Sequence, residues 1–525
     1  MVLKKAGFLY RTKRGVTRMK NGKGMDRRQF LTGVATAALA AGFVGTREAA
    51  AVGIPPGLQK LKRGRSHAFT QYLLPYPKIT AARGSETFWN QVREAFVLPE
   101  NYIHMNTGTT GSQPEFSLNN LVVYNLYKAE DPRDWQANLE SDFPDLFRND
   151  SERQAEIASL YGANDDEIVL SYNTTDALNL VFAGTPWNPG DRIITTQWEH
   201  GAMAGPMAWA RDYRGVDVKI IYLPSNFSDS VTKGDILALF EEELEAPLGA
   251  GNKQYVAFSE IFYKNGLRMP VAELASLARS YGAYTIVDTA HGWGMLPIDC
   301  HEYGVDFLCG AGHKWLCGGP GTGIFYIRNS GGDLPPFAQG NFASYGNLFT
   351  IPSNRFDDRT AWNPAQMQGR GEWNRPALYA MTDSAAFFGY VGVQDIYERG
   401  VALGAYLKDK IRTRWGAGAL WVDPGDPDFA TALTAFNPFV GKNDAGQYTT
   451  MRTAMNSAVS VLASEDPKIY IRTITWRDNP GSTGDDRIGF RVSTHGVYND
   501  YGQVDYMFDR LVAAVDATAL PQLGG

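Results

Sequence analysis

The chain contains few of the residues that cross-link small folds or bind metal ions. Three cysteines and seven histidines occur among its 525 residues, and it has neither a CxxC pair nor an HExxH pattern. A disulfide framework and the common zinc signatures are therefore excluded. Hydrophobic residues make up 44% and charged residues 20%, which excludes a disordered or collagen-like chain and predicts a globular protein of two or three domains.

Positive charge is scarce outside the N-terminal segment. Residues 1–51 contain 11 Lys and Arg against Asp26 and Glu48, a net charge of +9, and because the whole chain carries −6, the remainder carries −15. Nonspecific nucleic-acid binding depends on basic side chains that neutralise phosphates. We therefore expect no nucleic-acid partner.

Long hydrophobic runs are also lacking. The apolar run 31–44 is shorter than the roughly 20 residues of a membrane-spanning helix. It follows a basic stretch and precedes residues 49–51 (Ala-Ala-Ala), the order of an export signal cleaved after Ala51. Residues 27–31 (Arg-Arg-Gln-Phe-Leu) resemble the twin-arginine motif, which implies export of the folded protein by the twin-arginine translocase to the periplasm or medium. An uncleaved anchor is the alternative, and Met25 is an alternative start.

Short apolar runs then alternate with amphipathic stretches over most of the mature chain. Such alternation predicts an α/β fold with a mainly parallel, helix-covered sheet. Ligands bind such sheets at the carboxyl ends of the strands. Helices are expected at 86–96, 235–245, 271–281 and 375–388, and seven strands at 168–172, 192–196, 218–223, 255–258, 284–288, 306–309 and 323–327.

Two polar turns follow the first two predicted strands. Thr174 and Thr175 open a helix after the first strand, where free N–H groups and hydroxyls favour an anion such as phosphate. Ordinary helix capping explains such residues equally well. His200 follows the second strand, in the sequence Trp-Glu-His, and by itself indicates no function.

Two further turns, after the fifth and sixth strands, carry stronger chemistry. Asp288 and His291 lie three residues apart after the fifth strand, and a carboxylate there suits a protonated pyridine nitrogen, although Asp also caps turns. His313 and Lys314 follow the sixth strand and precede the Gly-rich segment 318–323. A Lys held among His, Trp and Gly is a candidate Schiff-base nucleophile, because burial lowers its pKa.

Taken in this order, these residues resemble the class V aminotransferases, a family of fold-type I enzymes that use pyridoxal 5′-phosphate (PLP). The resemblance covers about residues 100–510 and implies a large domain with a mainly parallel seven-stranded sheet and a smaller α+β C-terminal domain. It also implies a homodimer. The expected divisions are a signal (1–51), an arm and helix (52–98), a large PLP-binding domain (99–345), a linker (346–370) and a small domain (371–525).

The resemblance implies a role for each candidate residue. Lys314 would form the Schiff base and move the Cα proton, and Asp288 would pair with the pyridine nitrogen. His200 would stack on the pyridine face, and His291 would lie near the phenolic oxygen. The phosphate would be held by Thr174, Thr175 and His313.

The C-terminal segment resembles the family's closing motif, in which Arg491 would hold the substrate α-carboxylate; a strand-edge salt bridge is the alternative. The spacing of this motif is most similar to the isopenicillin N epimerase-like branch. Ala311 and Glu372 stand where the family usually has residues that contact the phosphate. At the position of Glu372, the family's contact is one that the partner subunit supplies. The last cysteine is Cys317, too early for the mobile thiol of a thiol-dependent cysteine desulfurase.

These features predict a PLP-dependent enzyme that acts at Cα of an amino acid, or of an amino-acid unit in a larger metabolite. Aminotransferase, epimerase and lyase chemistry all remain open. One alternative is a metal site, since five cysteine and histidine side chains lie close together in the sequence, although their spacing matches no common zinc motif. The other is a non-catalytic ligand-binding protein on the same fold. The five side chains belong to Cys300, His301, Cys309, His313 and Cys317.

Overall fold

The computed structural model describes residues 70–224, 227, 231–329, 372–478 and 484–524. The predicted signal and linker, residues 1–51 and 346–370, lie outside these residues. The chain divides into two compact units, Met1–Leu58 and Gln59–Gly525, and all described residues belong to the second. Among them, no helix is both long and apolar enough to cross a membrane.

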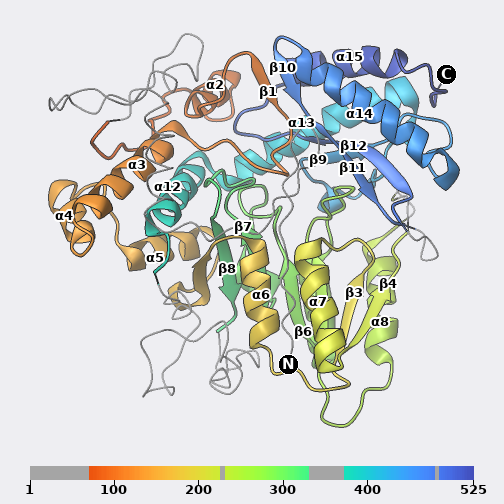
Figure 1. The fold of residues 1–525 in the computed structure, drawn as a ribbon, viewed down its shortest axis with the longest axis horizontal. Helices are drawn as coiled ribbons and strands as arrows, with labels where there is room; N and C mark the ends of the chain where they lie inside the picture. Colours follow the sequence, from red (N-terminus) through yellow and green to blue (C-terminus); the bar gives the residue numbers. More distant parts are fainter. Residues whose placement is uncertain (1–69, 225–226, 228–230, 330–371, 479–483, 525) are drawn as a thin grey trace, which may run out of the picture. The chain divides into compact units, whose positions relative to one another are not determined.

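A seven-stranded sheet forms the centre of the described chain (Figure 1). Its strand order is β2-β8-β7-β6-β5-β3-β4, and all neighbouring pairs are parallel except the two that involve β8. The mainly parallel seven-stranded sheet expected from the sequence is thereby confirmed. The strands are β2 (Ile168–Ser171), β3 (Arg192–Thr196), β4 (Asp217–Ile221), β5 (Gln254–Ser259), β6 (Tyr284–Asp288), β7 (Phe307–Ala311) and β8 (Gly323–Ile327).

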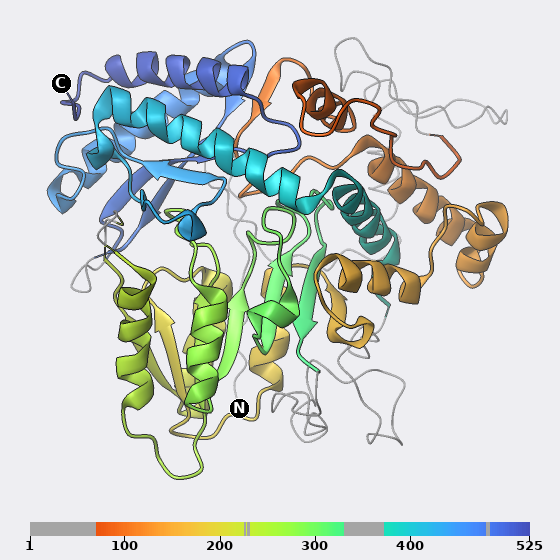
Figure 2. The same ribbon diagram turned by 180° about the vertical axis from the view of Figure 1, so that it is seen from behind.

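Helices cover both faces of this sheet. The helices α6 (Thr174–Gly184) and α7 (Gly201–Arg214) lie on one face, and α8 (Lys233–Glu245) and α9 (Val271–Ser280) lie on the other (Figures 1 and 2). Successive strand residues point to opposite faces. In β5, Tyr255 and Ala257 accordingly pack with the first helix pair, and Val256 and Phe258 pack with the second. Burial on both faces explains why these strands read as continuous apolar runs.

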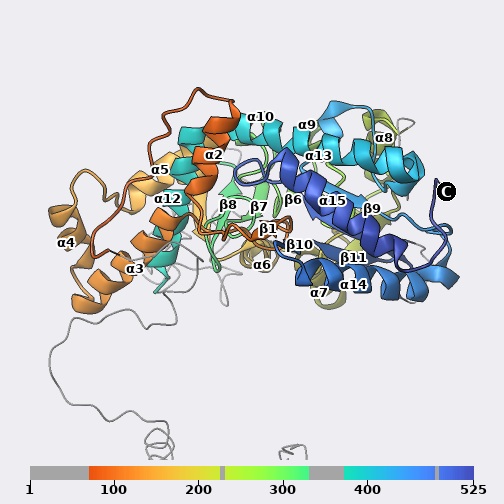
Figure 3. The same cartoon turned by 90° about the horizontal axis from the view of Figure 1, so that it is seen from above.

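The remaining described elements are mostly helices around the central sheet. Near the C-terminus, three strands form a smaller antiparallel sheet with the order β11-β12-β9 (Figure 3). This is the α+β part expected at the C-terminal end. The elements are α2 (Glu86–Glu94), β1 (Tyr102–His104), α3 (Glu115–Glu130), α4 (Trp135–Asp142), α5 (Asp150–Leu160), α10 (Cys300–Tyr303), α12 (Arg375–Val391), α13 (Val393–Trp415), β9 (Leu433–Phe436), α14 (Tyr448–Ser464), β10 (Lys468–Tyr470), β11 (Arg472–Trp476), β12 (Arg487–Ser493) and α15 (Tyr501–Asp516).

Two sets of contacts cross the domain boundary expected at residue 371. The strand β1 pairs in parallel with β10, which belongs to the expected small domain. The helix α12 packs against α3 and α5, where the buried carboxylate of Asp383 lies 2.8 Å from the buried Arg153 and also contacts Arg148. The N-terminal elements therefore connect the two predicted domains, and the division at 371 stays a prediction.

Candidate active site

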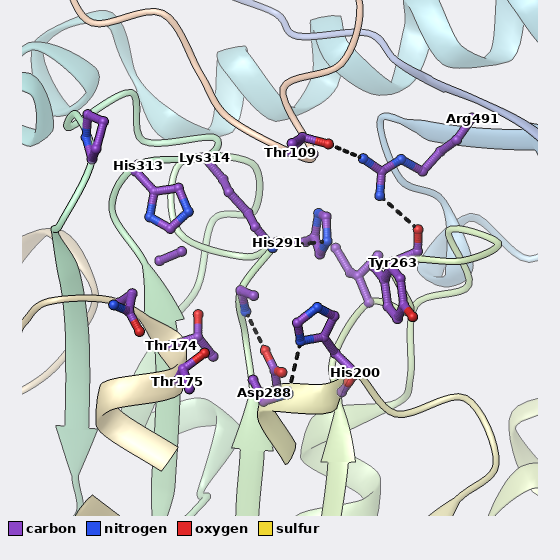
Figure 4. Close-up of a pocket in the computed structure, with 18 of the residues that line it drawn as sticks. Thr109, Thr174, Thr175, His200, Tyr263, Asp288, His291, His313, Lys314 and Arg491 are labelled. Atoms are coloured by element: carbon purple, nitrogen blue, oxygen red, sulfur yellow. Dashed lines mark hydrogen bonds between the residues drawn. The ribbon is translucent and has the colours of Figure 1, made fainter. Parts of the chain in front are cut away.

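A cavity of about 610 Å³ lies at the carboxyl ends of the sheet strands. Its walls come from the segment after β1, the start of α6, the turns after β3, β5, β6 and β7, and the strands β11 and β12. Figure 4 shows the side chains that converge there. All eight predicted site residues line it: Thr174, Thr175, His200, Asp288, His291, His313, Lys314 and Arg491.

One end of the cavity offers unpaired hydrogen-bonding groups to an anion. Thr174 begins α6, and the preceding Asn173 caps the helix by accepting a hydrogen bond from the Asp176 N–H at 2.9 Å. First-turn N–H groups of a helix have no partner within the helix and attract negative charge. Among the described residues, neither the buried Oγ1 of Thr174 nor the buried Nδ1 of His313 has a hydrogen-bond partner. A phosphate group fits these donors.

Asp288 ends β6 with a buried carboxylate. It accepts a hydrogen bond from the Ala290 N–H at 2.9 Å, and no cation of the described chain lies within 4.0 Å of it. Burial raises the pKa of Asp288 to about 6, although the positive charge of Lys314 acts in the opposite direction. A buried carboxylate without an ion-pair partner suits a cationic ligand group, and the protonated pyridine nitrogen of PLP is such a group.

The half-buried Lys314 reaches into the cavity from the turn after β7 (Figure 4). Desolvation is the main cause that lowers its pKa to about 8; the charge of Asp288 opposes this shift, and the charges of Arg491 and Arg472 add to it. About a tenth of Lys314 is therefore neutral at pH 7, and this neutral amine can act as a nucleophile or proton acceptor.

His291 is buried beside Lys314, with its Nε2 3.5 Å from the lysine Nζ. The indole N–H of Trp315 donates a hydrogen bond to Nδ1 of His291 at 3.0 Å. Burial lowers the pKa of His291 well below 6.5, and Lys314 adds to this effect, so the ring is neutral. Because Nδ1 accepts from an obligate donor, the proton of the neutral ring is on Nε2, which makes His291 a donor toward the cavity.

His200 also lines the cavity and caps α7, since its Nδ1 accepts from the Ala202 N–H at 3.1 Å. Desolvation lowers its pKa to about 4, and Lys314 contributes. The ring is therefore neutral. It stands edge-on to Tyr263, with ring centroids 4.9 Å apart.

Arg491 is 1% exposed and lies on β12. Its Nη1 donates to the Tyr263 carbonyl at 3.0 Å, and its Nη2 donates to Asn106 Oδ1 at 2.9 Å and Thr109 Oγ1 at 2.8 Å (Figure 4). Burial and the charge of Arg472 lower its pKa to about 9, so the guanidinium remains charged near neutral pH. These bonds fix the side chain in a place where it can receive a carboxylate.

Sequence reasoning missed the segment after β1 and the second arginine, Arg472. Asn106 and Thr109 hold Arg491. A Cβ on Gly108 would lie 3.2 Å from His291 Cε1 and 3.3 Å from Arg491 Nη2, so a glycine lets this segment approach the site closely. The run Thr-Gly-Thr-Thr-Gly at 107–111 was the available signal, because it is rich in small polar residues after a strand.

Three further histidines, His104, His301 and His495, make structural hydrogen bonds or ion pairs. His104 Nε2 bonds the Thr110 carbonyl at 2.8 Å, and His495 Nε2 bonds the Trp315 carbonyl at 2.7 Å. His301 Nε2 lies 2.6 Å from Glu167. Each of these contacts fixes a segment next to the site or the edge of the sheet.

Ala311 and Glu372, the two departures from the family pattern, and the three cysteines have ordinary structural surroundings. Ala311 ends β7 and lines the cavity, and the exposed Glu372 forms an ion pair with Lys128 at 2.5 Å. All three cysteines are buried, and none of them lines the cavity. In the described part of the chain, no group of three or more His, Cys, Asp or Glu is placed to bind a metal ion.

The profile of the family Aminotransferase class-V matches residues 105–436. The chain belongs to this family. Class V enzymes depend on PLP, their fold is that of the fold-type I enzymes, and the cavity described above fits this cofactor. The chain therefore belongs to a family of PLP-dependent enzymes. The residues at the two ends of its cavity suit the cofactor's phosphate and its pyridine nitrogen.

Two proteins and one solved structure illustrate what this chain is similar to. The isopenicillin N epimerase of Streptomyces clavuligerus is 28% identical over 241 residues, 46% of this chain and 56% of that protein. The chain thus matches just over half the length of this relative. The isopenicillin N epimerase of Amycolatopsis lactamdurans is 26% identical over 370 residues, 69% of this chain and 87% of that protein. The apo structure of a cysteine desulfurase from Thermococcus onnurineus NA1 has the same fold, with 20% identity, a TM-score of 0.62, and coverage of 84% and 99%.

Proposed function

We propose that this protein is a homodimeric, exported PLP enzyme that removes and returns the Cα proton of an amino acid, or of an amino-acid unit in a larger metabolite. Transamination, epimerisation and elimination all begin with removal of this proton. One observation carries the proposal: a half-buried lysine, Lys314, reaches into a cavity that has the carboxylate of Asp288 at one side and the guanidinium of Arg491 at another.

The residues of the cavity divide between cofactor and substrate. Thr174 and the start of α6 would hold the phosphate, together with His313. Asp288 would pair with the pyridine nitrogen and keep it protonated. When bound, PLP supplies an electron sink for the negative charge that proton removal leaves at Cα. Arg491 would receive the substrate α-carboxylate, because a guanidinium forms two parallel hydrogen bonds to a carboxylate.

Lys314 has the properties of the proton carrier. Its pKa of about 8 lets the neutral amine accept a proton at Cα and the ammonium return it at neutral pH. His291 presents an N–H toward Nζ of Lys314, so it orients the lone pair of the neutral amine. The neutral ring of His200, which lines the cavity, would cover one face of the cofactor ring and exclude water from it.

The surroundings of the cysteines favour reactions that need no protein thiol. Several relatives carry the name cysteine desulfurase, among them a protein of Mycobacterium leprae that is 33% identical over 36% of this chain. Here the three thiols are buried away from the cavity, and burial raises the pKa of Cys317 well above its ordinary value. The two epimerases named above support chemistry confined to Cα as the first candidate.

Borohydride reduction of the holoenzyme followed by peptide mass spectrometry tests the cofactor attachment. A phosphopyridoxyl mass is expected on the peptide with Lys314, and it should be missing in Lys314→Ala, which should also be inactive but folded. Incubation with candidate amino acids in deuterated water, followed by NMR, then separates the reactions. Deuterium at Cα with inversion indicates epimerisation, whereas a keto acid with pyridoxamine phosphate indicates transamination. Absence of the label on Lys314 would refute the proposal.

Export and dimer formation are tested separately. Secretion should yield a mature chain that begins near Val52, and replacement of Arg27 and Arg28 by lysine should retain the protein in the cytoplasm. A processed form of this double variant outside the cytoplasm would contradict the twin-arginine route. Light scattering of the holoenzyme should give twice the mass of one chain.

A further inference from the structure

Two arginines face each other across the strands at the mouth of the cavity. Arg472 on β11 and Arg491 on β12 are Cα partners in the antiparallel register, and both side chains line the cavity. The hydroxyl of Thr109 accepts hydrogen bonds from both, at 3.2 Å from Arg472 Nη1 and 2.8 Å from Arg491 Nη2. Like charges directly opposite each other destabilise a sheet, so the pair has a structural cost.

No carboxylate of the described chain compensates this charge. Within the described ranges, neither guanidinium has an Asp or Glu oxygen within 4.0 Å. Arg472 also donates from Nε to the Thr473 carbonyl at 3.1 Å, and its Nη2 makes no hydrogen bond to any described residue. The charge of Arg472 contributes to lowering the pKa of both Arg491 and Lys314, in keeping with its place on the same cavity wall.

We propose that Arg472 binds a second carboxylate, on the side chain of the substrate, so that the enzyme acts on acidic α-amino acids or on units that carry a second acid group. This proposal rests on the proposed function and names its substrate class. Arg491 is buried and held on both Nη atoms, next to Gly108 and His291, and takes the α-carboxylate. Arg472 is only half-buried, as expected for the group that meets the distal end of the substrate.

The competing arrangement is one carboxylate shared by both guanidinium groups. It differs in a measurable way, because a shared carboxylate makes Arg472 equally important for monocarboxylates and dicarboxylates. A side-chain site makes it far more important for dicarboxylates than for monocarboxylates.

Calorimetric titration of the holoenzyme with butyrate and with succinate, glutarate and adipate separates these arrangements. We expect at least one dicarboxylate to bind ten-fold or more tightly than butyrate. Arg472→Gln should remove this preference while it weakens butyrate binding far less than dicarboxylate binding, and Arg472→Lys should keep part of the preference. Arg477→Gln, a matched change at the exposed residue just beyond β11, should keep all of it.

The proposal is overturned if Arg472→Gln weakens butyrate and dicarboxylates equally, or if the unmodified enzyme prefers no dicarboxylate. Borohydride labelling of Lys314 in the same preparations distinguishes this failure from failure of the proposed function, since a labelled enzyme without dicarboxylate preference contradicts only the substrate class. Thermal unfolding without ligand checks the fold of Arg472→Gln, which should be no less stable than the unmodified protein because the like-charge pair is gone.

Discussion

Replacement of Asp288 by asparagine should stabilise the apoprotein and weaken the holoenzyme. The buried carboxylate has a folded-state pKa of about 6 against an ordinary 3.8. A pKa raised by folding means that the folded state binds more protons, so its stability is full below pH 3.8 and falls as the pH rises through 6. The difference corresponds to about 3 kcal/mol of destabilisation at pH 8, and linkage gives about half of that at pH 5.

Asparagine keeps the shape of the side chain and carries no charge. Urea unfolding of the apoprotein, followed by tryptophan fluorescence, should therefore show Asp288→Asn to be more stable than the unmodified protein, by about 3 kcal/mol at pH 8 and about half that at pH 5. The nearby Glu199 has a pKa raised by burial to about 7, and the charge of Asp288 contributes, so neutralising Asp288 eases its ionisation and acts in the same direction.

PLP should reverse this order. In the unmodified holoenzyme the pyridine nitrogen would neutralise the buried charge, and an amide cannot replace that ion pair, so the variant should gain less stability from PLP and lose activity. Asp212→Asn, at an exposed position on α7, is the matched control and should change stability by less than about 0.5 kcal/mol. An apo variant that is no more stable at pH 8, or a difference that does not depend on pH, would refute the reasoning.

Three further substitutions test the walls of the cavity. Trp315→Phe removes the donor to His291 Nδ1 and should shift the pH dependence of the bound cofactor's absorbance, at a cost of about 1 kcal/mol in stability. Gly108→Ala adds a Cβ 3.3 Å from Arg491 Nη2 and should raise KM more than it lowers kcat, which steady-state kinetics measure. Thr174→Val removes a hydroxyl without a described partner, so equilibrium dialysis should show PLP affinity reduced about five- to ten-fold with apoprotein stability retained.

The sheet and half of the cavity could be predicted because their signals are local. Seven apolar runs predicted seven strands, and the rule that ligands bind at carboxyl ends of parallel strands brought Asp288, His291 and Lys314 together. The direction of β8 was not predictable in this way, because a buried strand has the same apolar pattern in either direction. Its antiparallel pairing depends on the short connection after Lys314.

The substrate side of the cavity could not be predicted from local pattern. Arg472 reads as an ordinary polar position on a half-buried strand, and its significance comes from its register with Arg491 across an antiparallel pair. The effect of Trp315 on the proton position of His291 likewise depends on how a turn folds back. In both cases, only the three-dimensional fold determines how close the two residues lie and how their side chains are oriented.

The pairing of β1 with β10 has a consequence for the order in which the protein matures during synthesis. Tyr102 pairs with Lys468, near the opposite end of the chain, and the segment that follows β1 supplies Asn106 and Thr109 to Arg491. A nascent chain can therefore form the central sheet, with the proposed cofactor residues, early but cannot complete the substrate wall until almost all of it has left the ribosome. Pairings this distant in sequence form slowly, so closure of the substrate wall is a late event in the folding of each molecule.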